Sequence, residues 1–188
     1  MYRKVYLEAL RLLSRAFDIA EQRGAPRPVI VGGSAVEFYT GGAITSGDFD
    51  LVAARAEIVG EALIEVGFRR EDRRGVRLGG FYHPEILIGV ELVTGPLFAG
   101  RTDADRLQLV VVDEASDARV IFPPVEDMIA DRLGQHASDP RGRDDMLEQA
   151  RLLASLAENL DIAYLRRRVA EEGADPGILE SLMIHRSG

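Results

Sequence analysis

The stretch "VIVGGSAVEFYTGGAITSGDFDLV", residues 29–52, contains the pattern that decides the fold. Its apolar start predicts a short buried strand, and the segment 34–40 predicts a brief helix with Ser34 as its N-cap. A glycine-rich loop, "TGGAITSG", then leads to "DFDLVA", which predicts a second strand. A strand, a glycine turn, a helix and a second strand therefore follow one another closely, and the polar residues of this unit are the first candidates for a site.

Asp48 and Asp50 stand at the start of the second predicted strand. Because side chains alternate along a strand, both carboxylates point to one face, and Phe49 and Leu51 point to the other. Two carboxylates about 7 Å apart along a strand can bind one or two Mg²⁺ ions, which phosphate oxygens and water usually complete. The competing interpretation is a pair of solvated aspartates at an exposed strand start.

Gly32 and Gly33 mark the end of the first predicted strand. Because they have no Cβ, they allow the backbone to approach a ligand closely. Ser34 then opens the predicted helix, whose first N–H groups favour an anion, and its hydroxyl is a candidate donor to a phosphate. The competing interpretation is a tight turn capped by Ser34. No Gly-Lys-[Ser/Thr] or G-x-G-x-x-G pattern is present, so neither a P-loop nor a Rossmann fingerprint is predicted.

The ordered residues Gly32-Gly33-Ser34 and Ser46-Gly47-Asp48-Phe49-Asp50-Leu51 resemble the signature of the DNA polymerase beta nucleotidyltransferase superfamily. They are most similar to the minimal nucleotidyltransferases, many of which occur in bacterial toxin–antitoxin pairs. Residues 122–156 are more weakly similar to the helical tail of that group. The resemblance implies an α/β (α+β) fold with a small mixed sheet flanked by helices. Residues 1–124 would form this core, and residues 125–188 a C-terminal helical bundle packed on it.

The same resemblance implies transfer of a nucleoside monophosphate from an NTP to an acceptor hydroxyl, with Mg²⁺ or Mn²⁺ as cofactor. It assigns metal binding and catalysis to Asp48, Asp50 and a third carboxylate on a neighbouring strand. The candidates for the third carboxylate are, in order, Glu91, Asp113 and Glu85. The implied nucleotide-binding residues are Gly32, Gly33, Ser34, Ser46 and Arg132. The acceptor stays open among RNA, a protein and a small molecule such as an aminoglycoside.

Two features of the sequence depart from the family pattern. The loop before Asp48 contains no basic residue, whereas relatives often carry an arginine there. Arg132 occupies the helix that often carries a lysine. Because both positions would contact the triphosphate, we keep an alternative: a nucleotidyltransferase fold with weak or no catalysis, used as a binding protein such as one half of a toxin–antitoxin pair. An apolar patch among the C-terminal helices would mark its partner surface.

Periodicity predicts further elements along the chain. The expected helices are 5–20, 55–68, 125–136, 143–156, 162–172 and 176–184. The expected strands are 85–95 and two more within 106–123, around a turn at 115–117. The stretch 71–80 carries the turn signals of a connection or hairpin, and 139–144 resembles a linker. In the run Arg166-Arg167-Arg168, helical spacing points the side chains in different directions, which favours a solvated face.

The composition excludes several classes of protein. The 188-residue chain is 46% hydrophobic and 29% charged, as expected of a folded domain. Its net charge of −8 argues against broad, nonspecific nucleic-acid binding. It contains no cysteine, so disulfides and Cys-ligated zinc are excluded, and its histidines form no zinc-like spacing. No signal peptide or membrane span is predicted, so we expect a cytoplasmic protein with no membrane partner.

Overall fold

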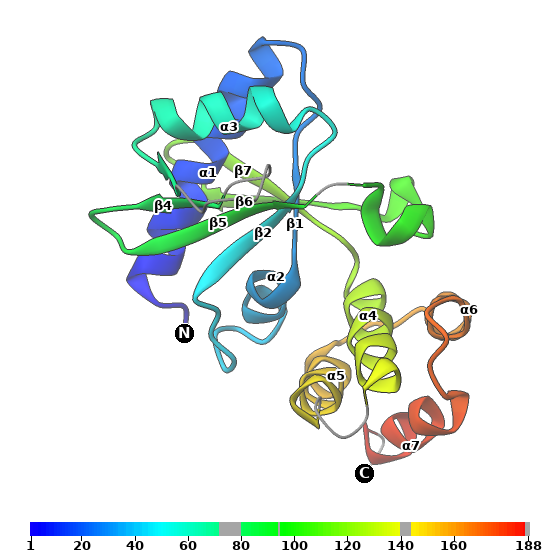
Figure 1. Cartoon of the computed structure of the whole chain (residues 1–188). Coiled ribbons are helices and arrows are strands. Elements are labelled where there is room, and N and C mark those ends of the chain that lie inside the picture. Colours follow the sequence, from blue (N-terminus) through cyan, green and yellow to red (C-terminus); the bar gives the residue numbers. More distant parts are fainter. Residues whose placement is uncertain (72–79, 94, 140–143, 187–188) are drawn as a thin grey trace.

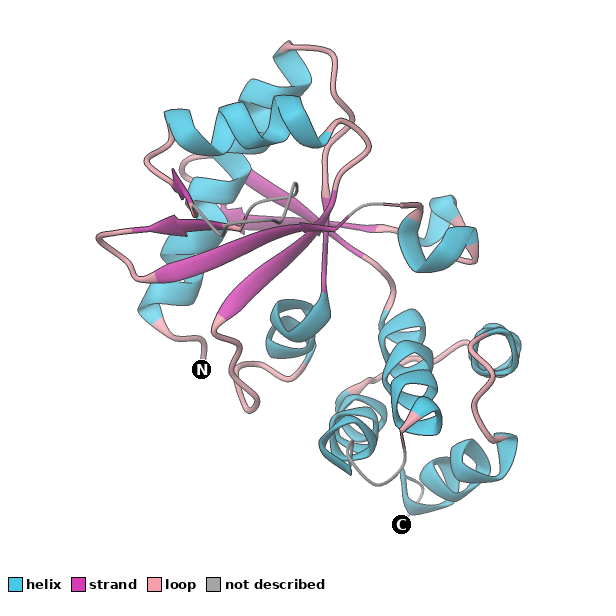
Figure 2. Ribbon diagram, in the orientation of Figure 1, coloured by secondary structure: helices cyan, strands magenta, loops and turns pink. Residues whose placement is uncertain are grey.

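The computed structural model describes residues 1–71, 80–93, 95–139 and 144–186. The helices are α1 (Lys4–Gln22), α2 (Gly32–Tyr39), α3 (Ala56–Glu65), α4 (Val125–Ser138), α5 (Asp144–Leu156), α6 (Ile162–Glu171) and α7 (Pro176–Arg186). The strands are β1 (Val29–Val31), β2 (Asp48–Val52), β3 (Arg69–Arg70), β4 (Phe81–His83), β5 (Ile88–Val93), β6 (Gln108–Asp113) and β7 (Ala118–Phe122). Figure 2 shows how strands and helices are distributed.

The described strands form one mixed seven-stranded sheet in the order β3-β4-β5-β2-β1-β7-β6. Strand β2 pairs antiparallel with β1 and parallel with β5, so it lies inside the sheet (Figure 1). Helices flank this sheet, and the described residues after β7 form helices only. The predicted fold class, a mixed sheet flanked by helices with a helical C-terminal region, is therefore confirmed.

The buried side of β2 packs against α1. Phe49 and Leu51 are buried, and the Phe49 ring stacks on Tyr6 of α1 with centroids 5.3 Å apart. The charged side chains at positions 48 and 50 point to the opposite side, as the alternation of a strand requires. Burial of Phe49 and Leu51 thus fixes the register that presents both aspartates together.

Helix α2 begins where β1 ends and lies between the first residues of the chain and β7. Its Phe38 ring stacks on Phe122 of β7 at 4.3 Å and on Tyr2 at 6.2 Å between centroids. The hydroxyl of Tyr6 donates to the Ser34 carbonyl across 2.8 Å. Helix α2 therefore holds the glycine turn rigidly against α1 and the sheet.

The helices α4 to α7 gather into one group at the other end of the molecule from α3 (Figure 1). A buried ion pair joins α4 and α6, with Arg168 Nε 2.6 Å from Asp127 Oδ1 and both side chains fully buried. The expectation of a solvated arginine run is therefore wrong for Arg168. Arg168 is tolerated in the interface between α6 and α4 because its guanidinium donates to Asp127, Glu171 and Glu172.

Some elements were not predicted. Strands β3 and β4 contain too few residues to show a periodicity, and the expected strand 85–95 begins only at Ile88, after the turn that leads from β4. Two 3₁₀ turns, Leu97–Gly100 and Ala104–Arg106, lie between β5 and β6. Most of the predicted connection 71–80 and of the linker 139–144 lies outside the described residues. Within the described part of the chain, no helix is both long and apolar enough to cross a membrane.

Candidate functional site

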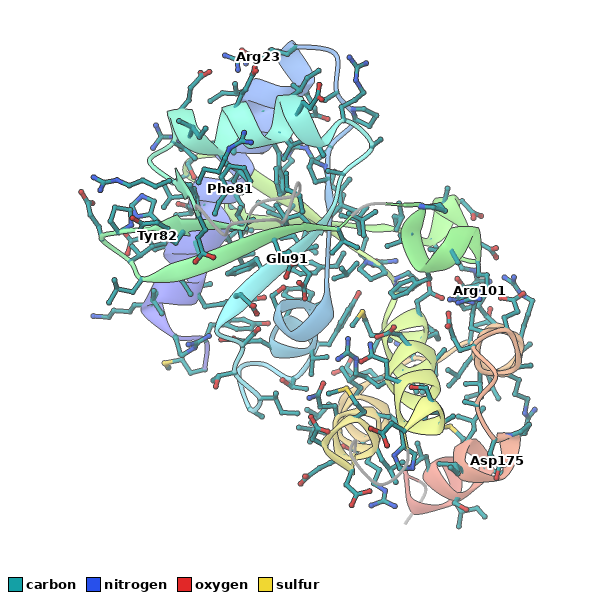
Figure 3. All side chains as sticks on the ribbon, in the orientation of Figure 1. Arg23, Phe81, Tyr82, Glu91, Arg101 and Asp175 are labelled. Atoms are coloured by element: carbon teal, nitrogen blue, oxygen red, sulfur yellow. The ribbon has the colours of Figure 1, made fainter. Side chains whose placement is uncertain are left out.

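Three carboxylates lie on neighbouring strands near the middle of the sheet. In the parallel pairing of β2 and β5, Asp50 stands directly opposite Glu91, and Asp48 stands opposite Gly89. Residues directly opposite each other on adjacent strands have their side chains on the same face. Figure 3 shows Glu91 near the centre of the sheet, beside β2. The structure thus places Asp48, Asp50 and Glu91, the first-ranked candidate, on one face of the sheet.

The other two candidates for the third carboxylate lie elsewhere. Asp113 ends β6, the outermost strand of the opposite half of the sheet, and accepts a hydrogen bond from Arg11 Nε at 3.0 Å. Glu85 lies in the turn between β4 and β5, before the strand begins. The expected strand 85–95 would have included Glu85, but β5 is shorter than the apolar run that predicted it and leaves Glu85 outside the strand.

The glycine turn packs directly on Asp50. Gly32 has φ +66°, a left-handed conformation, and a Cβ placed on it would lie only 1.9 Å from Asp50 Oδ2. A Cβ on Gly33 would lie 2.8 Å from Ser46 Oγ. Both glycines are therefore required by close approach, and the turn, Asp50 and Ser46 form one surface.

The pKa of Asp50 is raised from 3.8 to about 6. Burial is the largest cause, and the negative charges of Asp48 and Glu91 add to it, while Arg132 acts in the opposite direction. A carboxylate in this position repels its neighbours and binds a proton more readily than an exposed aspartate. A cation at the site would relieve this repulsion.

Ser34 does not play the part expected of an N-cap. Helix α2 begins at Gly32 with Val31 as its N-cap, so Ser34 lies within the first turn. Its side chain is fully buried, and its hydroxyl donates to the Val31 carbonyl at 2.9 Å. The prediction of an N-cap serine is therefore wrong, since the helix begins two residues before Ser34. The hydroxyl proton is used in this hydrogen bond to the backbone, so it does not point to the surface of the site.

Ser46 lies between the glycine turn and the first aspartate. Its hydroxyl donates to the Asp48 carbonyl at 2.9 Å and lies 3.4 Å from Asp48 Oδ1. Its backbone is held by two residues that the sequence did not single out, Arg3 and Glu37. The only signal in the sequence was a glutamate within an otherwise apolar helix, "AVEFY".

Arg132 reaches the neighbourhood of Asp50 from α4. It is buried, and its guanidinium lies 2.8 Å from Asp131 Oδ2, with Nη1 3.5 Å from Gln149 Oε1 of α5. Its charge still acts on Asp50, where it lowers the pKa. The structure thus places Arg132 within electrostatic reach of Asp50, while its hydrogen bonds go to Asp131 of its own helix and to α5.

Structural comparison relates this arrangement to known proteins. No protein-family model and no curated protein sequence matches the chain. A solution structure of the antibiotic-resistance factor ANT(2'')-Ia superposes with a TM-score of 0.55 and 18% identity, covering 95% of this chain and 98% of the other. A crystal structure of ANT(2'')-Ia in complex with adenylyl-2''-tobramycin gives a TM-score of 0.55 and 16% identity, covering 88% and 97%. ANT(2'')-Ia is a nucleotidyltransferase. This chain has a nucleotidyltransferase fold.

The comparison supports the fold and does not single out the minimal nucleotidyltransferase type. Within this nucleotidyltransferase fold, the described residues contain no group of three or more histidine, aspartate or glutamate side chains arranged as a complete metal site. Mg²⁺ is usually bound by one or two carboxylates, with substrate phosphates and water completing the shell. The oxygen ligands of Asp48 and Asp50 fit that mode, and the raised pKa of Asp50 reflects negative charge that a cation would offset.

A cavity of about 1350 Å³ lies between the loop before β2 and helices α5 and α7. Its charged lining residues are Asp144, Asp145, Glu148 and Arg151. Gln149, which also lines it, lies 3.5 Å from Arg132 and so connects the cavity to the surroundings of Asp50. The described lining is acidic, which favours a cationic ligand.

Proposed function

We propose that this protein is a Mg²⁺-dependent nucleotidyltransferase that transfers a nucleoside monophosphate from an NTP to an acceptor hydroxyl. The observation that carries the proposal is the register of β2 and β5, which sets Asp50 beside Glu91 on the face that also carries Asp48. The glycine turn in contact with Asp50 supports it further. A cytoplasmic location would supply both the NTP and the metal.

Each residue of the candidate site has its own role in the proposed reaction. Asp48 and Asp50 would hold Mg²⁺ or Mn²⁺, which when bound neutralises negative charge on phosphate oxygens. Gly32 and Gly33 let the start of α2 pack closely on Asp50 and Ser46, and the first N–H groups of this helix favour a phosphate there. Arg132 contributes positive charge from α4. Ser46 would orient Asp48 through the hydrogen bonds that its hydroxyl makes.

The acceptor oxygen attacks the α-phosphorus in line with the departing pyrophosphate. The bond from the α-phosphorus to the bridging oxygen breaks as the new ester forms, and the acceptor proton passes to a carboxylate. Glu91 and Asp50 are the two candidates for this base.

Transfer of label from α-³²P NTP tests this proposal. We expect wild type to label an acceptor in the presence of Mg²⁺, and Asp48→Asn/Asp50→Asn to abolish labelling while circular dichroism shows an intact fold. EDTA should abolish labelling by wild type. Undiminished labelling by the double variant would overturn the assignment of these carboxylates.

A cationic small molecule is the acceptor that the acidic cavity favours. One of the proteins with a similar fold, ANT(2'')-Ia, was solved in complex with adenylyl-2''-tobramycin. In this chain Asp144, Asp145 and Glu148 line a cavity of about 1350 Å³, and its Gln149 lies 3.5 Å from Arg132. Tobramycin, total RNA and a protein extract should therefore be offered in parallel. Preferential labelling of tobramycin that falls in Asp145→Asn/Glu148→Gln would support this acceptor, and labelling of RNA or protein alone would contradict it.

A nucleotidyltransferase-fold binding protein, such as a toxin–antitoxin component of the minimal nucleotidyltransferase type, is the second candidate. It is favoured because two residues expected to contact the nucleotide already make hydrogen bonds within the protein. The Ser34 hydroxyl bonds to Val31, and Arg132 bonds to Asp131. Both would leave the triphosphate weakly held. A stable complex with the product of a neighbouring gene, together with no labelling of any acceptor, would favour this function.

A further inference from the structure

Glu37 is a buried carboxylate beside the proposed site. It lies on α2 and has no exposed surface. Its oxygens accept hydrogen bonds from Arg3 Nε at 3.0 Å, from Arg3 Nη2 at 2.6 Å and from the Ser46 backbone N–H at 2.7 Å. A buried charge persists only where a partner and hydrogen bonds compensate its desolvation, and Glu37 has both.

Arg3 completes the arrangement from the start of the chain. Besides its two bonds to Glu37, Arg3 Nη2 donates to the Ser46 carbonyl at 2.6 Å. The N–H and the C=O of Ser46 are therefore both held by one ion pair. Ser46 belongs to the irregular segment between α2 and β2, where no strand or helix ladder fixes the backbone.

Ser46 in turn contacts Asp48 and the glycine turn. Its hydroxyl lies 2.9 Å from the Asp48 carbonyl and 3.4 Å from Asp48 Oδ1. It also packs on Gly33, where a Cβ would lie 2.8 Å from Ser46 Oγ. Any displacement of Ser46 would move both the glycine turn and the start of β2.

We infer that Arg3 and Glu37 are positioning residues, an ion pair that fixes Ser46 and thereby sets Asp48 and the glycine turn at their working distance. The inference rests on the proposed function, since Asp48 is the residue being positioned. The loop before Asp48 contains no basic residue of its own. Arg3, which is distant in sequence, brings a guanidinium to this loop and donates to its backbone at Ser46.

Two variants separate this role from simple anchoring of the N-terminus. Arg3→Ala removes the bonds to Glu37 and Ser46. Tyr2→Phe is the matched control, because the Tyr2 hydroxyl ties the same N-terminal segment to the same helix through the Phe38 carbonyl at 2.8 Å and does not touch Ser46. Arg3→Lys keeps the charge beside Glu37 but cannot reproduce the fork of the guanidinium, and it serves if Arg3→Ala does not fold.

Amide hydrogen exchange and steady-state kinetics are then measured on the full chain. We expect Arg3→Ala to accelerate exchange at residues 44–48 by at least about tenfold. We also expect it to lower kcat by about 100-fold with a much smaller change in the KM for the NTP. Arg3→Lys should give intermediate values, and Tyr2→Phe should leave both quantities near wild type.

The outcomes distinguish this inference from the proposed function. Wild-type exchange in Arg3→Ala, or faster exchange with wild-type kcat, would overturn the positioning role. Equal effects of Tyr2→Phe and Arg3→Ala would also overturn it, because they would indicate general anchoring. If wild type neither binds nor transfers any nucleotide while Arg3→Ala still frees residues 44–48, the ion pair holds the loop as inferred and the proposed chemistry fails.

Discussion

Gly32 shows how much of the site depends on single residues. It combines φ +66° with a position where a Cβ would lie 1.9 Å from Asp50 Oδ2, so a side chain here must displace Asp50. Gly24 offers a matched comparison, because its φ is +78° and an added Cβ would meet nothing within 4 Å. The two positions separate backbone strain from contact with the site.

Alanine at these two glycines should therefore have different consequences. We expect Gly32→Ala and Gly24→Ala each to lower the free energy of unfolding by about 1–2 kcal/mol through the left-handed backbone alone. Only Gly32→Ala should also lose the stabilisation by Mg²⁺ and NTP. Urea denaturation and nucleotide-dependent thermal shifts measure the two effects. Retention of the nucleotide effect in Gly32→Ala would show that the glycine turn does not shape the site.

Asp50 gives a prediction for pH. Its pKa of about 6 in the folded protein exceeds the value of 3.8 expected for an unperturbed aspartate. A raised pKa stabilises the fold fully below the unfolded value, and this contribution is lost as the pH rises through about 6. In metal-free protein at pH 7, we expect Asp50→Asn to raise the free energy of unfolding by about 1 kcal/mol, since partial exposure screens the repulsion. At pH 4 the substitution should have little effect.

Melting temperatures at pH 4 and pH 7 in EDTA test this prediction. The expected gain corresponds to about 2–4 °C at pH 7 for a chain of this size. Asp105→Asn, which removes an exposed charge outside the carboxylate cluster, is the control. Excess Mg²⁺ at pH 7 should reverse the order, making wild type the more stable protein. An equal gain at both pH values would contradict the assigned repulsion among the carboxylates.

Helix α6 carries two neighbouring arginines in opposite environments. Arg168 is fully buried and bonds to Asp127, Glu171 and Glu172. Arg166 is exposed and pairs with Glu180 at 2.9 Å. The sequence alone does not separate them, because a run of arginines in a helix is typical of a solvated face. The distinction is made by α4, whose Asp127 lies 41 positions away in sequence.

Removing either arginine tests how α6 is held. We expect Arg168→Ala to destabilise the protein by about 3–5 kcal/mol, because it leaves the buried charge of Asp127 uncompensated. Arg166→Ala should cost less than about 1 kcal/mol, as for other exposed pairs. The double variant Arg168→Met/Asp127→Asn should recover much of the loss. Denaturant unfolding measures all three, and equal effects of Arg168→Ala and Arg166→Ala would contradict the buried pairing.

At the level of elements, the sequence predicts what depends on neighbouring residues. The glycine turn, the strand bearing Asp48 and Asp50, and the long helices all follow from local patterns. Strands β3 and β4 do not, since pairing across the sheet defines them and not periodicity. The strand containing Glu91 was predicted, whereas its exact pairing with β2 comes from the sheet register.

For the whole molecule, the limits of sequence reasoning lie in contacts between distant residues. The ion pair of Arg3 with Glu37 joins residues 34 positions apart, and the bond from Arg3 to Ser46 spans 43 positions. No local sequence pattern predicts either contact. The sequence therefore indicated the carboxylates of the candidate site, while the structure was needed to find the residues that hold them in place.

The most direct test of the account is a thermal-shift titration with each NTP, with and without Mg²⁺. It compares wild type with Asp48→Asn/Asp50→Asn. Ligand at about 100 times its Kd adds roughly 2.7 kcal/mol of stability, which for this size corresponds to about 5–10 °C. We predict such a shift for wild type only when Mg²⁺ is present, and its loss in the double variant. A wild type that shifts with no nucleotide, or a double variant that shifts equally, would contradict the account.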